Sequence, residues 1–212
     1  MNADVLIVGS GPSGASTALS LLRHGIAVTV VTADKSSPGI PVDVLSPEVK
    51  PEFASIGLQN KRFTDLGVAC YGIDAAWGGA KPVSYSFLRH PYGDGIAIQR
   101  LDLHRVLVQC VTDAGGHNRG GRFVSAERTS KGWRVTLQGG EITEQLECRV
   151  LVDATGRASV ISRYMGARFR RYDSLCCVSA LLDSCKQDHV LTVTSTEYGW
   201  CCLLYTSPSP RD

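Results

Sequence analysis

The first two dozen residues restrict the fold of this chain most strongly. An apolar run of strand length, Asp4–Val8, leads into the turn Gly9-Ser10-Gly11-Pro12-Ser13-Gly14, and a helical pattern follows that stops at Gly25. A second apolar run occupies Ile26–Val31. A Gly-x-Gly-x-x-Gly turn between a strand and a helix, followed by a second strand, is typical of a βαβ unit that binds a dinucleotide.

The spacing of the glycines in this turn has a physical reason. Gly9 permits the tight turn, Gly11 lets the backbone approach a diphosphate, and Gly14 lets the helix pack closely on the strand. The N–H groups at the start of the helix then face the diphosphate. We therefore expect the whole turn to bind the dinucleotide, namely Gly9, Ser10, Gly11, Pro12, Ser13 and Gly14. The alternative is an ordinary glycine-rich turn of an α/β protein.

The composition is typical of a globular protein, and the length suffices for one sizeable core or for one domain plus part of another. The chain has 212 residues, of which 43% are hydrophobic and 20% charged, with a formal net charge of +2. This charge gives no reason to expect a nucleic-acid partner. No apolar run reaches the roughly 18 residues that an integral membrane segment needs. Because Asp4 precedes the first apolar run and no basic residue does, we expect no signal peptide and a cytoplasmic location.

The eight cysteines do not indicate a metal site. None of them forms a Cys-x-x-Cys pair, and no histidine stands at zinc-ligand spacing. Without a secretory signal, we expect these residues to be buried cysteines or free thiols in a reducing compartment.

Downstream of the opening unit, the pattern predicts short strands, loops and two helices. Residues 36–51 are rich in proline and are expected to form a loop, and 67–90 to form strands and loops with many aromatic side chains. The predicted helices are 51–58 and 101–114. The predicted strands are 96–98, 122–127, 132–137 and 148–153, the last of them buried.

A second motif narrows the choice among dinucleotide-binding folds. The apolar run that begins at Val150 ends in Asp153-Ala154-Thr155-Gly156, and Gln99-Arg100 stands at the head of the helix 101–114. Together with the opening turn, these residues resemble the FAD-dependent oxidoreductases related to aromatic hydroxylases. The resemblance is greatest to the branch of flavin-dependent halogenases, geranylgeranyl reductases and flavoproteins that mature quinone-cofactor enzymes. It covers 3–34 and 94–200 well and 35–93 poorly.

The resemblance implies FAD as the cofactor and an α/β fold. It predicts a Rossmann-like FAD-binding domain, with a βαβ start and a mixed sheet, over 1–35 and 94–166. Part of a β-rich substrate domain would occupy 36–93 and 167–201.

The resemblance also assigns cofactor-binding roles beyond the opening turn. Arg100 would reach FAD from the start of its helix, and Asp153, Ala154 and Gly156 would form a second turn beside the cofactor. The alternatives are that Arg100 is a solvated residue and that Asp153 caps the helix after Gly156.

The chain departs from the family pattern at two positions. The family places an acidic residue at the end of the second strand, where it accepts hydrogen bonds from the adenosine ribose. Here Thr32 stands at that position and Asp34 follows two residues later. Either Asp34 binds the ribose, or Thr32 makes a neutral hydrogen bond to it. We count Thr32 among the cofactor-binding residues. Asp43 stands where a glutamate near the flavin is common.

The predicted function is that of an FAD-dependent oxidoreductase, similar to monooxygenases and halogenases, acting on an unidentified small molecule or protein. The alternatives are a maturase flavoprotein for a protein-derived quinone cofactor, an NAD(P)-binding dehydrogenase, and a non-catalytic protein with a flavin fold. No catalytic residue is assigned. His90, His104 and His117 are expected to be structural or exposed. The aromatic residues Trp77, Tyr85, Phe87 and Tyr92 line a substrate cleft or belong to the core.

The last eleven residues, 202–212, match a translated reading frame of a transposase sequencing adapter at every position. We therefore expect 202–212 to be a non-native tail on an N-terminal fragment of a longer oxidoreductase. In such a fragment, 176–182 and 191–200 would be unprotected strand edges.

Overall fold

The computed structural model describes residues 2–33, 42–58, 67–79, 81–180 and 189–204. The chain divides into two compact units. The first comprises Met1–Pro38 and His104–Cys176, and the second comprises Gly39–Leu103 and Cys177–Asp212. The boundary between Leu103 and His104 falls inside the helix α4 (Arg100–Asp113). That these units correspond to a cofactor domain and a substrate domain stays a prediction.

The first unit begins with the predicted βαβ arrangement. Strand β1 (Asn2–Val8) leads into the glycine turn, helix α1 (Pro12–Arg23) follows, and β2 (Val28–Thr32) runs parallel to β1. The helix ends where predicted, because Gly25 adopts a φ of 73°, a conformation that favours glycine. The two strands are apolar because they are buried on both faces.

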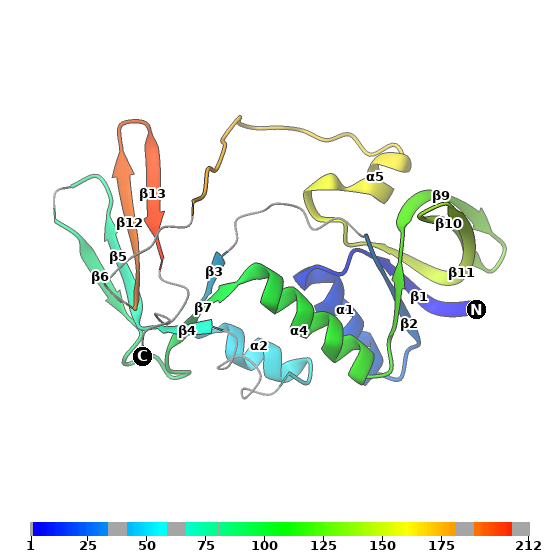
Figure 1. Cartoon of the computed structure of the whole chain (residues 1–212), viewed down its shortest axis with the longest axis horizontal. Coiled ribbons are helices and arrows are strands. Elements are labelled where there is room, and N and C mark those ends of the chain that lie inside the picture. Colours follow the sequence, from blue (N-terminus) through cyan, green and yellow to red (C-terminus); the bar gives the residue numbers. More distant parts are fainter. Residues whose placement is uncertain (1, 34–41, 59–66, 80, 181–188, 205–212) are drawn as a thin grey trace. The chain divides into compact units, whose positions relative to one another are not determined.

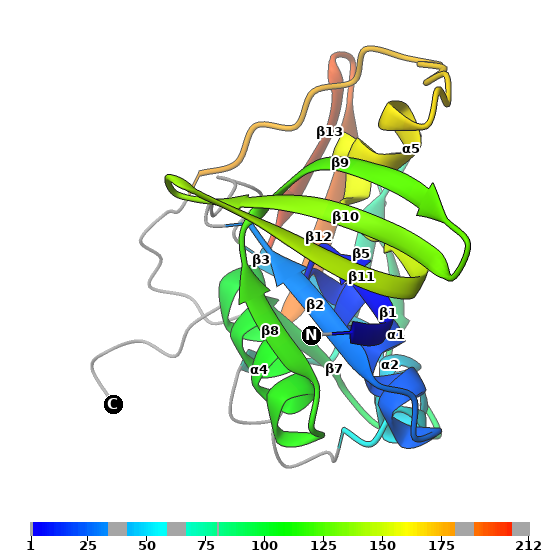
Figure 2. The same ribbon diagram turned by 90° about the vertical axis from the view of Figure 1, so that its right-hand side faces the viewer.

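A six-stranded mixed sheet forms the body of the first unit, in the order β8-β2-β1-β11-β10-β9 (Figure 1, Figure 2). Its other strands are β8 (His117–Gly120), β9 (Arg122–Thr129), β10 (Gly132–Gly139) and β11 (Ile142–Asp153). Strands β8, β2, β1 and β11 are parallel neighbours, whereas β9, β10 and β11 form an antiparallel meander. This arrangement confirms the predicted Rossmann-like fold with a mixed sheet.

Helices α1, α4 and α5 (Val160–Tyr164) contact the sheet of the first unit, α4 through hydrogen bonds from Asn118 of β8 to Val108 and Thr112. Helix α1 contacts β1 and β2, and α5 contacts β9 and β11. Leu6 and Val8 of β1 belong to the same buried cluster as Ile161 of α5. Because side chains alternate along a strand, Ile7 points to the opposite face. The short 3₁₀-helix η1 (Gly156–Ala158) connects β11 to α5.

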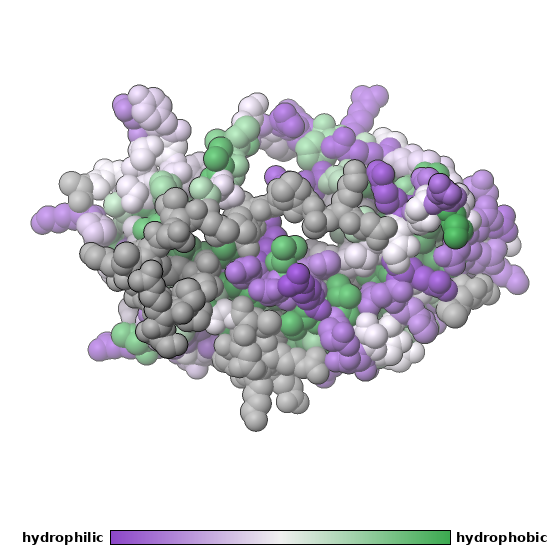
Figure 3. All heavy atoms as spheres, in the orientation of Figure 1, coloured by the Kyte–Doolittle hydropathy of each residue, from purple (hydrophilic) through white to green (hydrophobic). Residues whose placement is uncertain are grey.

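Strand β11 is longer than predicted, and the prediction that 148–153 is buried is wrong for part of its length. Cys148 is 5% exposed, but Val150 is 50% exposed. Burial alternates only over 145–149, mostly where β11 pairs with β10, because an antiparallel sheet can leave one face to solvent. Figure 3 shows mainly hydrophilic residues over β9–β11 on the face that it presents.

The second unit contains two smaller sheets, in the orders β3-β7-β4 and β13-β12-β5-β6. Their strands are β3 (Val42–Leu45), β4 (Gly67–Cys70), β5 (Gly72–Ala76), β6 (Val83–Ser86), β7 (Gly95–Gln99), β12 (Val190–Thr196) and β13 (Gly199–Leu203). The strand β12 pairs with both β5 and β13, so the expectation that 191–200 is an unprotected edge is wrong for β12. Cys202 and Leu203, in the expected tail, pair with β12, whereas 205–212 lie outside the described residues.

Two predictions on local structure in the second unit need correction. The proline-rich stretch 36–51 is not all loop, because β3 within it pairs with β7 between Pro41 and Pro47. Helix α2 (Val49–Ser55) begins earlier and ends earlier than the predicted 51–58. It ends there because Gly57 adopts a φ of 87° and the Leu58 N–H then donates to the Phe53 carbonyl at 2.8 Å. Within the described parts of both units, no helix has the length and apolarity that crossing a membrane requires.

Candidate functional site

The glycine turn of the first unit is held between the ends of β1, β2 and β11. The Gly9 N–H donates to the Val31 carbonyl and the Ala154 N–H to the Val8 carbonyl, both at 2.9 Å. A Cβ on Gly9 would lie 2.2 Å from the Ala154 oxygen, and one on Gly14 would lie 1.9 Å from the Gly9 oxygen. Packing therefore requires glycine at both positions, and the structure brings the two sequence motifs into direct contact.

Gly11 is different, because nothing in the described chain requires a glycine there. No heavy atom lies within 4 Å of the position that its Cβ would take, and its φ of −62° suits any residue. Gly11 caps α1 without a side-chain hydrogen bond, and the first helical bond runs from the Ala15 N–H to the Gly11 carbonyl. The N–H groups of Ser13 and Gly14 therefore have no acceptor within the helix. Open space beside unused donors at a helix start suits an anionic group.

Ser10 is anchored by a residue outside the turn that the sequence analysis does not assign to the cofactor site. Its side chain is buried, and its Oγ lies 2.8 Å from Nε2 of His104 in α4, within the first unit. The prediction for His104 was a structural or exposed role. Since 94 residues separate the two partners, no local pattern signals this contact.

Thr32 lies at the end of β2, where the family pattern places an acid. Its Oγ1 is buried and has no hydrogen-bond partner among the described residues, while its carbonyl accepts from the Gly121 N–H at 2.9 Å. An unpaired buried hydroxyl is costly, because it has lost its bonds to water without replacement. Asp34, the other candidate for the ribose, lies outside the described residues.

The side chain of Asp153 holds together the turn after β11. One carboxylate oxygen accepts from the N–H and the hydroxyl of Thr155, at 3.1 and 2.6 Å, and the other from the N–H and the hydroxyl of Ser162, at 2.8 and 2.7 Å. Partial burial raises the pKa of Asp153, but these hydrogen bonds outweigh it and lower the pKa to about 2. The carboxylate is therefore ionised and engaged with the turn, as the helix-capping alternative requires. A direct contact of Asp153 with FAD stays a prediction.

Arg100 belongs to the second unit, where it pairs with Asp43. Its Nε and Nη2 donate to the two carboxylate oxygens of Asp43, each at 2.7 Å. Hydrogen bonding to Asp43 raises the pKa of Arg100. The side-on pair leaves the other edge of the guanidinium, which includes Nη1, without a contact to Asp43. The predicted contact of Arg100 with FAD remains a prediction.

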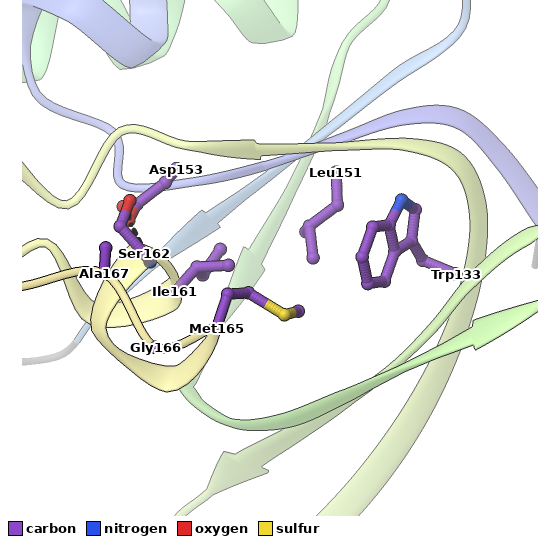
Figure 4. A pocket seen from close by; sticks show the side chains of 8 residues that line it. All are labelled: Trp133, Leu151, Asp153, Ile161, Ser162, Met165, Gly166 and Ala167. Carbon is purple, nitrogen blue, oxygen red and sulfur yellow. Dashed lines mark hydrogen bonds between the residues drawn. The ribbon is translucent and has the colours of Figure 1, made fainter.

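A hollow of about 530 Å³ lies between α5 and the sheet of the first unit (Figure 4). Its lining comes from β10, β11 and the region of α5, and consists of Trp133, Leu151, Asp153, Ile161, Ser162, Met165, Gly166 and Ala167. None of these residues belongs to the glycine turn. Because its only carboxylate, that of Asp153, is already bonded to Thr155 and Ser162, the hollow offers mainly an apolar wall.

The aromatic residues of the second unit do not form one core cluster. Phe87 is 2% exposed and belongs to the core, whereas Trp77, Tyr85 and Tyr92 are exposed. Tyr85 contacts the edge of Phe87 with ring centroids 5.7 Å apart. The core alternative is therefore confirmed for Phe87 and wrong for Trp77, Tyr85 and Tyr92, for which a substrate cleft stays a prediction.

Comparison with known proteins identifies relatives along almost the whole chain. Residues 2–208 match the family described as FAD binding domain. LodB of Marinomonas mediterranea, which is named as an FAD-dependent oxidoreductase, is 27% identical over 93% of this chain and 55% of its own length. Menaquinone reductase of Mycobacterium tuberculosis is 28% identical over 80% of this chain and 41% of its own length. The chain thus spans about half the length of these curated relatives.

Solved structures share the fold at lower sequence identity. A flavoprotein/dehydrogenase from Cytophaga hutchinsonii is similar with a TM-score of 0.76 and 17% identity, over 98% of this chain and 53% of the other. The flavin-dependent brominase Bmp2 is similar with a TM-score of 0.66 and 18% identity, over 78% of this chain and 41% of the other.

Proposed function

The chain belongs to the FAD-binding-domain family. We therefore propose that it functions as part of an FAD-dependent oxidoreductase similar to the monooxygenases and halogenases. FAD, when bound, supplies the redox chemistry, and the protein supplies binding, orientation and electrostatic tuning. The family match favours FAD over the NAD(P) alternative. The substrate is a small molecule or a protein, and we propose a cytoplasmic location from the sequence alone.

The observation that carries the proposal is the open space above Gly11. The neighbouring glycines, Gly9 and Gly14, are explained by packing, whereas the open space at Gly11 leaves room for a group that approaches the backbone there. A diphosphate fits the site, because the unused N–H groups at the start of α1 are donors and the helix dipole favours negative charge. The turn residues Gly9, Ser10, Gly11, Pro12, Ser13 and Gly14 would hold this diphosphate.

The other predicted residues have distinct proposed roles. The unpaired hydroxyl of Thr32 would bond the adenosine ribose. Ala154, which follows β11, packs against the glycine turn. Asp153 holds this part of the chain in place through its hydrogen bonds to Thr155 and Ser162. Gly156 begins η1 with a φ of 63°, next to the Asp153–Thr155 segment. Arg100 would contact FAD through the edge of its guanidinium that Asp43 leaves open.

The test replaces Gly11 and Gly14 by alanine and measures FAD binding and stability separately. We expect Gly11→Ala to leave the stability of the ligand-free protein within about 1 kcal/mol of the parent, because the new methyl group meets nothing. FAD affinity should fall at least tenfold, because the methyl group occupies the approach to the backbone. Gly14→Ala, the matched control, should lower the melting temperature strongly, because its Cβ would overlap the Gly9 oxygen.

The flavin absorbance of the purified protein provides the direct readout. A parent protein that binds no FAD would contradict the proposal. Unchanged FAD affinity in a well-folded Gly11→Ala variant would exclude the glycine turn as the diphosphate site.

A further inference from the structure

One contact of the glycine turn has no role in the function proposed so far, namely the hydrogen bond between Ser10 and His104. Ser10 is 6% exposed, and its Oγ lies 2.8 Å from Nε2 of the histidine. The turn is also held by main-chain hydrogen bonds and glycine packing through Gly9, Gly14 and Ala154. Within α1, the Thr17 hydroxyl donates to the Ser13 carbonyl at 2.8 Å. Ser10 thus supplies the turn with a side-chain anchor to α4.

The hydroxyl of Ser10 would otherwise compete with a ligand. Serine side chains readily bond to backbone groups a few residues away, as they do in turns and at helix starts. In this turn the nearby donors are the N–H groups of Ser13 and Gly14, which lack an intrahelical acceptor. By engaging Oγ of Ser10, the imidazole directs the hydroxyl toward α4 and away from these donors.

We propose that His104 is a positioning residue for the diphosphate of FAD, acting through Ser10. The inference rests on the proposed function, because that function makes the diphosphate of FAD the ligand of the turn. His104 touches neither FAD nor substrate in this role. It fixes the backbone between Gly9 and Gly11 and keeps the N–H groups of the first helical turn available to the phosphate oxygens. Either ring tautomer suffices, because a neutral imidazole nitrogen can donate to or accept from the hydroxyl.

The experiment compares His104→Leu, His104→Gln, Ser10→Ala and the double variant Ser10→Ala/His104→Leu. Glutamine carries an amide group at a reach similar to that of Nε2, so it can keep the bond to Ser10. His117→Leu is the matched control, because His117 lies exposed on β8. Two ligands are titrated: FAD by flavin fluorescence, and ADP by calorimetry, which reports on the diphosphate without the flavin.

We expect His104→Leu and Ser10→Ala each to weaken both ligands by about 3- to 10-fold, the value of one hydrogen bond. The double variant should be no weaker than the more affected single variant, because both remove the same bond. His104→Gln should bind within about twofold of the parent, and His117→Leu should bind like the parent. If His104 had only a structural role, its substitution would change the melting temperature. The affinity for ADP would then not be lost in His104→Leu and kept in His104→Gln.

Four results would decide against the inference or its premise. Additive losses in the double variant, or parent-like ADP affinity in a folded His104→Leu variant, would overturn the role of His104 while leaving the FAD site intact. Failure of His104→Gln to restore binding would also overturn it. If the parent itself bound neither FAD nor ADP, the proposed function would fail instead. Should His104→Leu not fold, Ser10→Ala alone tests the same bond.

Discussion

Replacing Thr32 by valine separates the cost of a buried hydroxyl from its use in binding. The Oγ1 of Thr32 has no hydrogen-bond partner among the described residues, and a buried unpaired hydroxyl costs about 1–3 kcal/mol. Valine has nearly the same shape and suits a strand, so Thr32→Val should remove this cost without a cavity. The ligand-free variant should therefore be more stable than the parent by about 1–2 kcal/mol.

The same substitution should weaken FAD binding, because the hydroxyl would then no longer meet the ribose. Loss of one neutral hydrogen bond of about 0.5–1.5 kcal/mol corresponds to a roughly 2- to 12-fold higher Kd. Stability and affinity thus change in opposite directions, which an ordinary core or surface threonine would not produce. Thr32→Ser keeps the hydroxyl and should retain the affinity for FAD. Asp34→Asn tests the competing carboxylate and should bind like the parent.

The assay consists of chemical denaturation without ligand, followed by titration of FAD into each folded variant. A lower unfolding free energy for Thr32→Val would refute the assignment of an unpaired hydroxyl. An unchanged Kd for Thr32→Val, together with a strong loss for Asp34→Asn, would assign the ribose contact to the carboxylate instead.

Three further substitutions or treatments test other parts of the structure. Asp153→Asn should lower the free energy of unfolding by about 1–3 kcal/mol at neutral pH. Because the pKa of Asp153 is lowered from 3.8 to about 2, this stabilisation is present above pH 3.8 and is lost as the pH falls toward 2. Parent and variant should therefore become equally stable in acid denaturation. Asp43→Ala should lower stability by less than about 1 kcal/mol, because its ion pair with Arg100 is partly solvated, and a melting-temperature shift larger than a few degrees would contradict this estimate. Burial raises the pKa of the Cys148 thiol to about 11, so maleimide at pH 7.5 should modify Cys148 only after denaturation, as mass spectrometry of the labelled peptides would reveal.

The parts of the fold that were predictable are those encoded by local patterns. The opening βαβ unit was predicted because apolar strand runs and the Gly-x-Gly-x-x-Gly spacing are contiguous in the sequence. The sequence does not predict strand β3, because Pro41 and Pro47 indicate a loop, whereas its pairing with β7 is a contact between distant segments. Tertiary pairing can override such local propensities.

The candidate site was predictable only in part for the same reason. The chemistry of Gly11 follows from a motif, but the partner of Ser10 depends on how α4 lies against the turn. For Asp153 the sequence offered both a cofactor contact and a helix cap, and the four hydrogen bonds to Thr155 and Ser162 supply the evidence for the cap.

The contact between Gly9 and Ala154 also sets the order in which the site can form. Ala154 packs against the glycine turn only when β11 has paired with β1, although 145 residues separate Gly9 from Ala154. Closing so long a loop costs conformational entropy before any contact rewards it, and topologies with such distant pairings fold slowly. During synthesis, a nucleotide can therefore stabilise the emerging chain only after residue 154 has left the ribosome. Until then, the chain carries the fingerprint of the site without the backing that shapes it.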